Sequence, residues 1–238
     1  MQNTPRRRLA VARVLCLTLM LMLMVAVTRV PATPARALPI DPALDAVEAP
    51  AGPALATTVR LRTPFGQHTI YIIGDSLTVG ADVFGGLSER LTAAGYTVRI
   101  NANVGRTIAV GNTILVTEAA AGRLEPVVMV ALGTNDVWAG RSTATITKSI
   151  DDVMATVGNR WVIWVNIQMR DTVAAARFNL LLRNRLTTYP RTIIADWSST
   201  PNLQYMQRLG IHYSPAGYLN RAIFLVDYLE LATGNKPG

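Results

Sequence analysis

The sequence predicts an α/β protein, a three-layer α/β/α sandwich in which one five-stranded parallel sheet lies between two layers of helices. The chain has 238 residues, enough for one α/β domain with additional segments. From about residue 65 onward, five short apolar runs alternate with five longer helical segments, which is the pattern of repeated βα units. One run, Val127–Leu132, is apolar at every position, as expected for a parallel strand covered on both faces.

The predicted elements follow one another in a simple alternation. The predicted strands are the short apolar runs Thr69–Ile73, Thr97–Asn101, Val127–Leu132, Trp161–Ile167 and Thr192–Ala195. The predicted helices are the longer segments Thr78–Ala94, Thr107–Ala121, Thr143–Val157, Thr172–Thr188 and Pro215–Leu231. Pro215 suits the first turn of the last helix, because that turn does not use its N–H groups.

The first 64 residues are predicted to lie outside this domain. Residues 1–37 resemble a secretory signal peptide, with a basic start, the apolar stretch Val14–Val27 and the small-x-small sequence Ala35-Arg36-Ala37. An uncleaved N-terminal anchor, with transient membrane association, is the alternative, although the stretch is shorter than the about 20 residues of a membrane span. Residues 38–64 are rich in Pro and Ala and are predicted to be a linker or arm. Residues 65–238 then form the domain of a secreted or cell-envelope protein.

The net charge of +8 does not indicate a nucleic-acid partner. Residues 1–37 hold six of the 23 basic residues and no acid, so the remainder carries 17 Lys and Arg against 15 Asp and Glu, a net charge of +2. The single Cys16 lies in the predicted signal peptide, which leaves no thiolate for a disulfide or a metal site. With no metal-ligand spacing, no P-loop and no Gly-x-Gly-x-x-Gly, the sequence predicts no cofactor.

Gly74-Asp75-Ser76 directly follows the first predicted strand and is the first candidate catalytic motif. A strand that ends in a small residue and a serine indicates a tight turn at the C-terminal edge of the sheet, where α/β proteins place their chemistry. Ser76 is therefore a candidate nucleophile, which a neighbouring base would activate. The alternative is that Ser76 caps the following helix. The chain has no Gly-x-Ser-x-Gly sequence, so an α/β-hydrolase nucleophile elbow is excluded.

His212 is the candidate general base among the two histidines of the chain. His68 precedes the first predicted strand and should lie at the opposite, N-terminal edge of the sheet. His212 follows the last predicted strand, in a loop that can return over the C-terminal edge. The alternative is an ordinary surface histidine.

Four sequence blocks together resemble the SGNH (GDS-type) family of serine esterases and acyltransferases. In chain order they are Gly74-Asp75-Ser76, Asn103-Val104-Gly105, Gly133-Thr134-Asn135-Asp136 and Gly210-Ile211-His212. The resemblance extends over residues 65–232 and implies the flavodoxin-like strand order 2-1-3-4-5. It also implies that Ser76 is the nucleophile and that His212 is the base that takes its proton.

The resemblance implies an oxyanion hole made of the Ser76 N–H, the Gly105 N–H and the Asn135 side chain. Acyl transfer builds negative charge on the carbonyl oxygen, so donors must point at that position in advance. A residue without a Cβ lets substrate approach its N–H closely, and an amide donates without adding charge. The alternatives are an ordinary turn glycine and a turn with a helix cap at Asn135.

One position departs from the family pattern. The family has an aspartate three residues before the histidine, and this chain has Leu209, which cannot accept a hydrogen bond from the imidazole. Three interpretations are open: a backbone carbonyl orients His212 in a Ser-His dyad, Asp196 is a substitute acid, or the site has lost catalysis. Removal of a triad acid elsewhere costs about 10⁴ in rate without abolishing catalysis.

The segment Trp161–Arg170, the later Asn179 and the pair Asp196-Trp197 resemble the extracytoplasmic SGNH domains of bacterial cell-wall O-acyltransferases. Asn166, Gln168 and Arg170, at alternate positions, are predicted to share one face of a strand or of its extension. Arg170 would then hold a carboxylate or phosphate of a glycan. Trp138 is a candidate for lining the acyl or sugar subsite, with a core tryptophan as the alternative.

The resulting expectation is a metal-independent serine esterase or acyltransferase that acts on acyl esters, O-acetyl first among them, of cell-envelope carbohydrate. The partner is then the acyl ester or glycan substrate. Two other functions remain open: a non-catalytic domain that binds envelope glycan through a degraded site, and a lipase or thioesterase of broad specificity.

Overall fold

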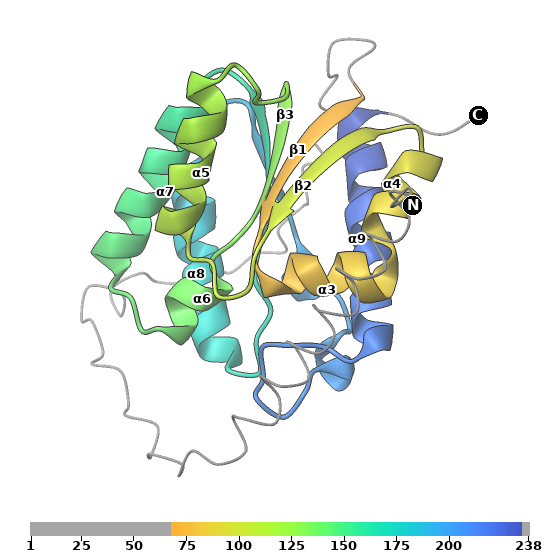
Figure 1. Cartoon of the computed structure of the whole chain (residues 1–238). Helices are drawn as coiled ribbons and strands as arrows, with labels where there is room; N and C mark the ends of the chain where they lie inside the picture. The colour runs from red at the N-terminus through yellow and green to blue at the C-terminus, as the bar shows by residue number, and fades with distance from the viewer. Residues whose placement is uncertain (1–67, 235–238) are drawn as a thin grey trace, which may run out of the picture. The chain divides into compact units, whose positions relative to one another are not determined.

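The computed structural model describes residues 68–234 and contains one parallel sheet (Figure 1). Its strands are β1 (Thr69–Gly74), β2 (Thr97–Ala102), β3 (Val127–Ala131), β4 (Trp161–Val165) and β5 (Thr192–Ala195). They are arranged in the order β2-β1-β3-β4-β5, and every neighbouring pair is parallel. The predicted α/β fold and the strand order that the family resemblance implies are both confirmed.

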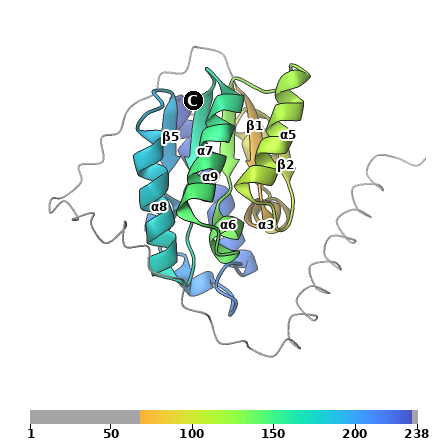
Figure 2. The ribbon, with the colours of Figure 1, turned by 90° about the vertical axis from the view of Figure 1, so that its left-hand side faces the viewer.

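Helices cover both faces of the sheet (Figures 1 and 2). On one face lie α5 (Ile108–Ala120), α7 (Thr143–Val157) and α8 (Thr172–Leu186), with the short α6 (Thr134–Trp138). On the other face lie α3 (Ser76–Gly85), α4 (Leu87–Ala93) and α9 (Pro215–Thr233). Two 3₁₀ helices, η2 (Trp197–Ser199) and η3 (Leu203–Tyr205), lie between β5 and α9.

Alternation along the strands separates two apolar cores. In β1, Tyr71 and Ile73 pack on the α5–α7–α8 side, and Ile70 and Ile72 pack on the α3–α4–α9 side. All four side chains are buried, because successive side chains of a strand point to opposite faces and both faces are covered. The sheet thereby fixes the ends of β1, β3 and β5 at one common edge.

The predicted helix Thr78–Ala94 is wrong as a single element, because the chain breaks it at Gly86. This residue has φ of +65°, a left-handed conformation that glycine adopts without strain, and its N–H bonds to the carbonyls of Ala81 and Asp82. Two helices therefore form, α3 and α4, and only α3 carries Ser76.

The fourth strand is two residues shorter than predicted, because a side chain takes the place of a strand partner. The Asn179 amide accepts a hydrogen bond from the N–H of Ile167 at 3.0 Å and donates one to its carbonyl at 2.8 Å. The chain leaves the sheet after Val165 and enters the loop that precedes α8. The short helix α6 was not predicted, because five residues are too few for a periodic pattern.

The predicted signal peptide, residues 1–37, and the predicted linker, residues 38–64, lie outside the described residues and stay predictions. Between residues 68 and 234, no helix is both long enough and apolar enough to span a membrane.

Candidate active site

Ser76 is the first residue of α3 and lies directly beyond the C-terminal end of β1. The helix cap is Asp75, whose Oδ1 accepts a hydrogen bond from the Leu77 N–H at 2.9 Å, so the capping role does not fall to Ser76. A Cβ at Gly74 would lie 2.2 Å from Oγ1 of Thr78, which explains why the turn needs glycine there. The Ser76 side chain, although only 4% exposed, faces a histidine from the far end of the sequence.

The structure brings Ser76 and His212 together. Oγ of Ser76 lies 3.0 Å from Nε2 of His212, within hydrogen-bond distance, although 136 positions separate the two residues. Burial lowers the pKa of His212, so the imidazole is neutral at physiological pH and can accept the hydroxyl proton. If Oγ–H donates to Nε2, the ring proton resides on Nδ1.

Nδ1 of His212 has no hydrogen-bond acceptor among residues 68–234. Leu209, at the position of the family's acid, is 48% exposed. Oδ1 of Asp196 accepts hydrogen bonds at 2.7 Å from both Asn166 Nδ2 and Ser198 Oγ, and no bond joins Asp196 to His212, so the structure does not support Asp196 as substitute acid. No backbone carbonyl of the described chain binds Nδ1 either. Nδ1 has no partner in the described chain but is not shielded from solvent, so water can reach it.

Two of the three predicted oxyanion donors are free of internal partners. Among residues 68–234, neither the N–H of Ser76 nor that of Gly105 forms a hydrogen bond within the protein. Gly105 has φ of +74° and is exposed, so the bend in the loop requires glycine and leaves its N–H open to a ligand.

The third predicted donor, Asn135, is already bonded. Its Nδ2 donates to Oδ2 of Asp75 at 3.2 Å and to the carbonyl of Arg106 at 3.1 Å. The ionised Asp75 carboxylate and the Arg106 carbonyl can only accept hydrogen bonds. The Asn135 amide is therefore oriented with its nitrogen toward the turn that carries Ser76. An oxyanion would therefore have to share or displace one of these acceptors.

Arg106, which the sequence did not single out, supports the loop of Gly105. Its buried guanidinium donates to the carbonyl of Gly74 at 3.2 Å, to the Asn101 carbonyl, and to Asn101 Oδ1 at 2.8 Å. It thereby fastens the Gly105 loop to the ends of β1 and β2. An arginine directly after the block glycine was the available signal. Burial lowers the pKa of Arg106 without removing its charge.

Asp75 is the most perturbed acid of the site. Burial raises its pKa to about 6, and the nearby positive charge of Arg221 opposes that rise. Near neutral pH the carboxylate is thus largely ionised and can accept from both Leu77 and Asn135. Its role is structural, as a brace between the nucleophile turn and α6.

The predicted substrate contacts separate into exposed and structural residues. Trp138, the last residue of α6, is 56% exposed and available to a ligand. Arg170 is exposed, but its Nη2 donates to the carbonyl of Met206 at 3.1 Å and its N–H to that of Gly210 at 2.9 Å. Asn166 and Gln168 are buried and do not share an open face with it.

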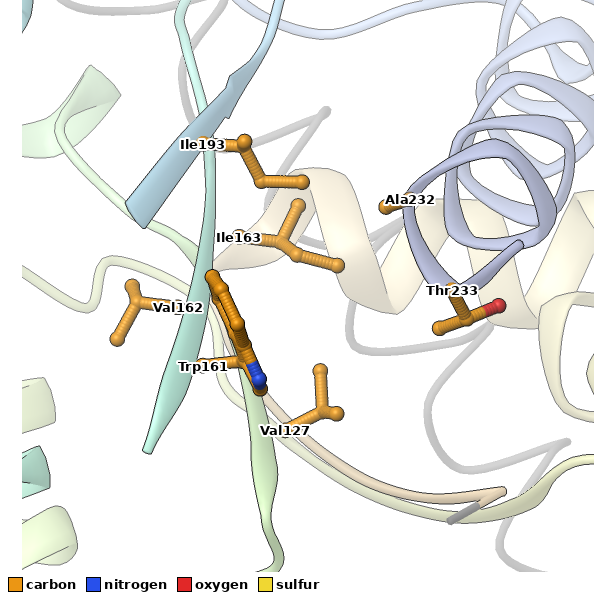
Figure 3. Close-up of a pocket in the computed structure, with 7 residues that line it drawn as sticks. All are labelled: Val127, Trp161, Val162, Ile163, Ile193, Ala232 and Thr233. Atoms are coloured by element: carbon orange, nitrogen blue, oxygen red, sulfur yellow. The ribbon is translucent and has the colours of Figure 1, made fainter. Parts of the chain in front are cut away.

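A separate apolar pocket lies away from this site (Figure 3). Val127 and Trp161, the first residues of β3 and β4, line it together with Ala232 and Thr233 of α9. The starts of these strands lie at the sheet edge opposite to Ser76, so this pocket does not contribute to the candidate active site. In the described part of the chain no group of His, Cys, Asp and Glu could hold a metal ion.

Solved structures share this arrangement of elements. The catalytic C-terminal domain of peptidoglycan O-acetyltransferase A (OatA) from Streptococcus pneumoniae, solved with a methylsulfonyl adduct, is 20% identical over 71% of this chain and 96% of that domain, with a TM-score of 0.56. The esterase EstA from a Pseudoalteromonas species, inhibited by monoethylphosphonate, is 14% identical over 68% and 97%, with a TM-score of 0.56.

A member of the lipolytic G-D-S-L family from Veillonella parvula is 18% identical over 67% of this chain and 96% of its own, also with a TM-score of 0.56. No protein-family model and no curated protein sequence matches the chain. Structural similarity at these sequence identities shows the fold alone. The described chain has the fold of the SGNH (GDSL) hydrolases.

Proposed function

We propose that this protein is a secreted serine esterase or acyltransferase that acts on acyl esters through a Ser76–His212 dyad. The observation that carries the proposal is the 3.0 Å approach of Ser76 Oγ to Nε2 of a neutral His212 at the C-terminal edge of the sheet. An alcohol next to a neutral imidazole can lose its proton as it attacks a carbonyl carbon.

In the first half-reaction, Ser76 Oγ attacks the ester carbonyl and His212 Nε2 takes the hydroxyl proton. The negative charge that forms on the carbonyl oxygen is met by the N–H groups of Ser76 and Gly105. When the tetrahedral intermediate collapses, the imidazolium returns the proton to the leaving alcohol and the acyl group remains on Ser76. Water or a sugar hydroxyl then repeats these steps and releases the acid or a new ester.

The proposed substrate is an O-acetyl ester of cell-envelope carbohydrate. The fold shared with the OatA catalytic domain and the signal-like sequence of residues 1–37 support this choice. The exposed indole of Trp138, three residues after Asn135 in α6, offers an apolar surface against which a sugar ring or acyl group can pack.

The test is the hydrolysis of a chromogenic acetate ester by the purified protein and by Ser76→Ala. The proposal expects turnover by the wild type and loss of nearly all of that rate in the variant. Equal rates in the two proteins would refute it. Acetate transfer is then sought by adding an envelope glycan as acceptor and measuring acetylated product by mass.

A second candidate function, a non-catalytic envelope-glycan binding domain, is favoured by the missing acceptor at Nδ1 and by the bonded amide of Asn135. This candidate requires that the wild type bind glycan without turning over any ester. It also predicts that a serine-directed fluorophosphonate leaves Ser76 unmodified.

A lipase or thioesterase differs from the leading proposal only in its acyl group. Exposed Val104, within the second sequence block, and exposed Leu209, directly before the fourth, would favour longer chains. Esters of increasing chain length separate the two, because a rate that rises with length would replace O-acetyl as the preferred substrate.

A further inference from the structure

The loop that carries His212 is a closed hairpin. Met206 and Tyr213 form an isolated antiparallel bridge. Within it, the N–H of Gln207 donates to the carbonyl of His212 at 2.7 Å, and Gln207 Nε2 donates to the carbonyl of Tyr213 at 3.1 Å. Gln207 therefore holds the main chain at His212 and at the residue that follows it.

A buried chain of polar side chains ties this hairpin to the ends of β4 and β5. The Tyr213 hydroxyl accepts from Trp197 Nε1 at 2.9 Å and donates to Gln168 Oε1 at 3.2 Å. Gln168 Nε2 in turn donates to the carbonyls of Thr200 at 2.8 Å and Ser198 at 3.3 Å. Each of these side-chain groups is satisfied, and a fully satisfied buried network holds one geometry.

Packing restrains the same residues. The rings of Trp197 and Tyr213 meet edge to face, with centroids 5.6 Å apart and an interplanar angle of 86°, and both side chains are buried. Tyr213 directly follows His212 in the chain, so the position of Tyr213 restrains the Cα from which the His212 side chain extends. Its hydroxyl has no direct contact with Ser76 and lies outside the reacting groups.

We propose that Gln168 and Tyr213 are positioning residues for His212, which hold the imidazole toward Ser76 in a site where Leu209 cannot. The inference rests on the proposed function, because positioning has a consequence only if His212 serves as base. A carboxylate would orient the ring and stabilise the imidazolium. The neutral Gln168–Tyr213–Trp197 chain supplies orientation alone, through the backbone of residue 212.

The experiment measures the second-order rate constant for modification of Ser76 by a fluorophosphonate, a one-step reaction that needs an activated hydroxyl. Tyr213→Phe removes only the hydroxyl, and Gln168→Met removes its partner at similar volume. Each should slow labelling about 10- to 100-fold, the range expected for misplacement of a catalytic group by up to 1 Å. The double variant should be labelled no more slowly than the slower of the two single variants, because both substitutions break the same chain of hydrogen bonds.

Tyr228→Phe is the matched control. Its hydroxyl donates to the carbonyl of Ile194, so the variant also removes a phenol bond to the backbone, but one far along α9 from the hairpin. Labelling of this variant should stay within about 2-fold of wild type, because only the hydroxyl is lost and the ring keeps its packing on Phe224, the neighbour of Trp197. In a His212→Ala background, Tyr213→Phe should change the residual labelling rate no further.

Three results would overturn the inference: wild-type labelling in Tyr213→Phe, an equal loss in Tyr228→Phe, or an undiminished effect of Tyr213→Phe without His212. If the buried variants do not fold, Gln207→Leu, at a half-buried position, removes the bond to Tyr213 O and should slow labelling about 3- to 10-fold. An unchanged rate there counts against the inference. Wild type that is not labelled refutes the proposed function as well, whereas labelled wild type with insensitive variants refutes the positioning role alone.

Discussion

The two sides of the candidate site differ in how their polar groups are held. On the serine side, Asp75 braces both the Leu77 N–H and the Asn135 amide, and Arg106 fastens the neighbouring loop. On the histidine side, Nδ1 of His212 has no acceptor in the described chain, and the side chains that bond to Tyr213, the next residue, are neutral. The nucleophile's geometry is therefore fixed by charged groups, whereas the base depends on neutral hydrogen bonds and packing for its position and on solvent for its second nitrogen.

The histidine side is therefore the half of the site that limits the chemistry. A neutral imidazole can take the serine proton, but the imidazolium that results has no carboxylate to stabilise it. We therefore expect an enzyme with an intact nucleophile and a weakened base.

The largest expected effect is the loss of the base. His212→Gln should lower kcat for acetate-ester hydrolysis about 10³-fold, within the range that general base catalysis contributes. His68→Gln is the matched control, because His68 precedes β1 at the opposite edge of the sheet. Steady-state kinetics of both variants decide the matter. A similar fall in both would show that the loss is not specific to the site.

The next effect sharpens the comparison by adding the missing charge. Leu209→Asp places a carboxylate where the family has one, on a half-exposed position where folding should tolerate it. We expect kcat/KM to rise about 10²-fold, a fraction of the about 10⁴ that a triad acid contributes elsewhere. Leu209→Asn, which adds a polar group without charge, should gain much less. No gain in the Asp variant would mean that residue 209 cannot reach His212.

A smaller effect is expected on the serine side, in stability. The folded pKa of Asp75, about 6, lies above its ordinary value of 3.8, so the folded state binds the proton more tightly than the unfolded state does. The stability that this group contributes therefore falls as pH rises from about 4 to about 6. Asp75→Asn should remove this fall, with a gain of up to roughly 3 kcal/mol at pH 7. The lowered folded pKa of His212 makes the stability from that group rise with pH, the opposite dependence. Wild type and Asp75→Asn share this contribution, so it cancels in their difference.

The measurement for Asp75→Asn is the difference in Tm between variant and wild type from pH 4 to pH 8. It should grow through pH 4 to 6 and then level off, while ester hydrolysis falls because Asn135 loses the acceptor that orients it. A difference that does not depend on pH would contradict the burial of an ionisable acid at residue 75.

The smallest expected effect is the position of the acid limb of the pH profile. Because burial lowers the pKa of His212, kcat/KM of wild type should reach half of its maximum below pH 6.5. A carboxylate at residue 209 favours the imidazolium, so the same limb should move to higher pH in Leu209→Asp. A wild-type midpoint above 6.5 would show that another group already stabilises the protonated imidazole.

The sequence pattern was sufficient for the strands, and the family resemblance supplied their order and the pairing of Ser76 with His212. Apolar runs and helical periods located every strand, since burial on both faces leaves a strong pattern, as in Val127–Ala131. It could not show that Gly86 splits a helix, nor that Asn179 ends β4 through its side chain, because both depend on local hydrogen bonds.

The supporting residues were the least predictable part of the site. Arg170 looks like a ligand contact in the sequence and Gln168 like its neighbour on one strand face, yet the fold uses both to hold the segments before α9. Asp196 likewise looks available as an acid, and its partners Asn166 and Ser198 occupy it. Side-chain direction at a strand end depends on tertiary contacts, which the two-residue period of a strand does not encode.

We propose that Ser76 is an activated nucleophile although no acid of the described chain supports its base. The most direct measurement is intact-mass analysis of the protein after reaction with a fluorophosphonate, followed by peptide mapping. We expect one adduct per chain, located on Ser76, and none in Ser76→Ala or after prior unfolding. A wild-type protein that stays unmodified, or that is modified equally when residue 76 is alanine, would contradict it.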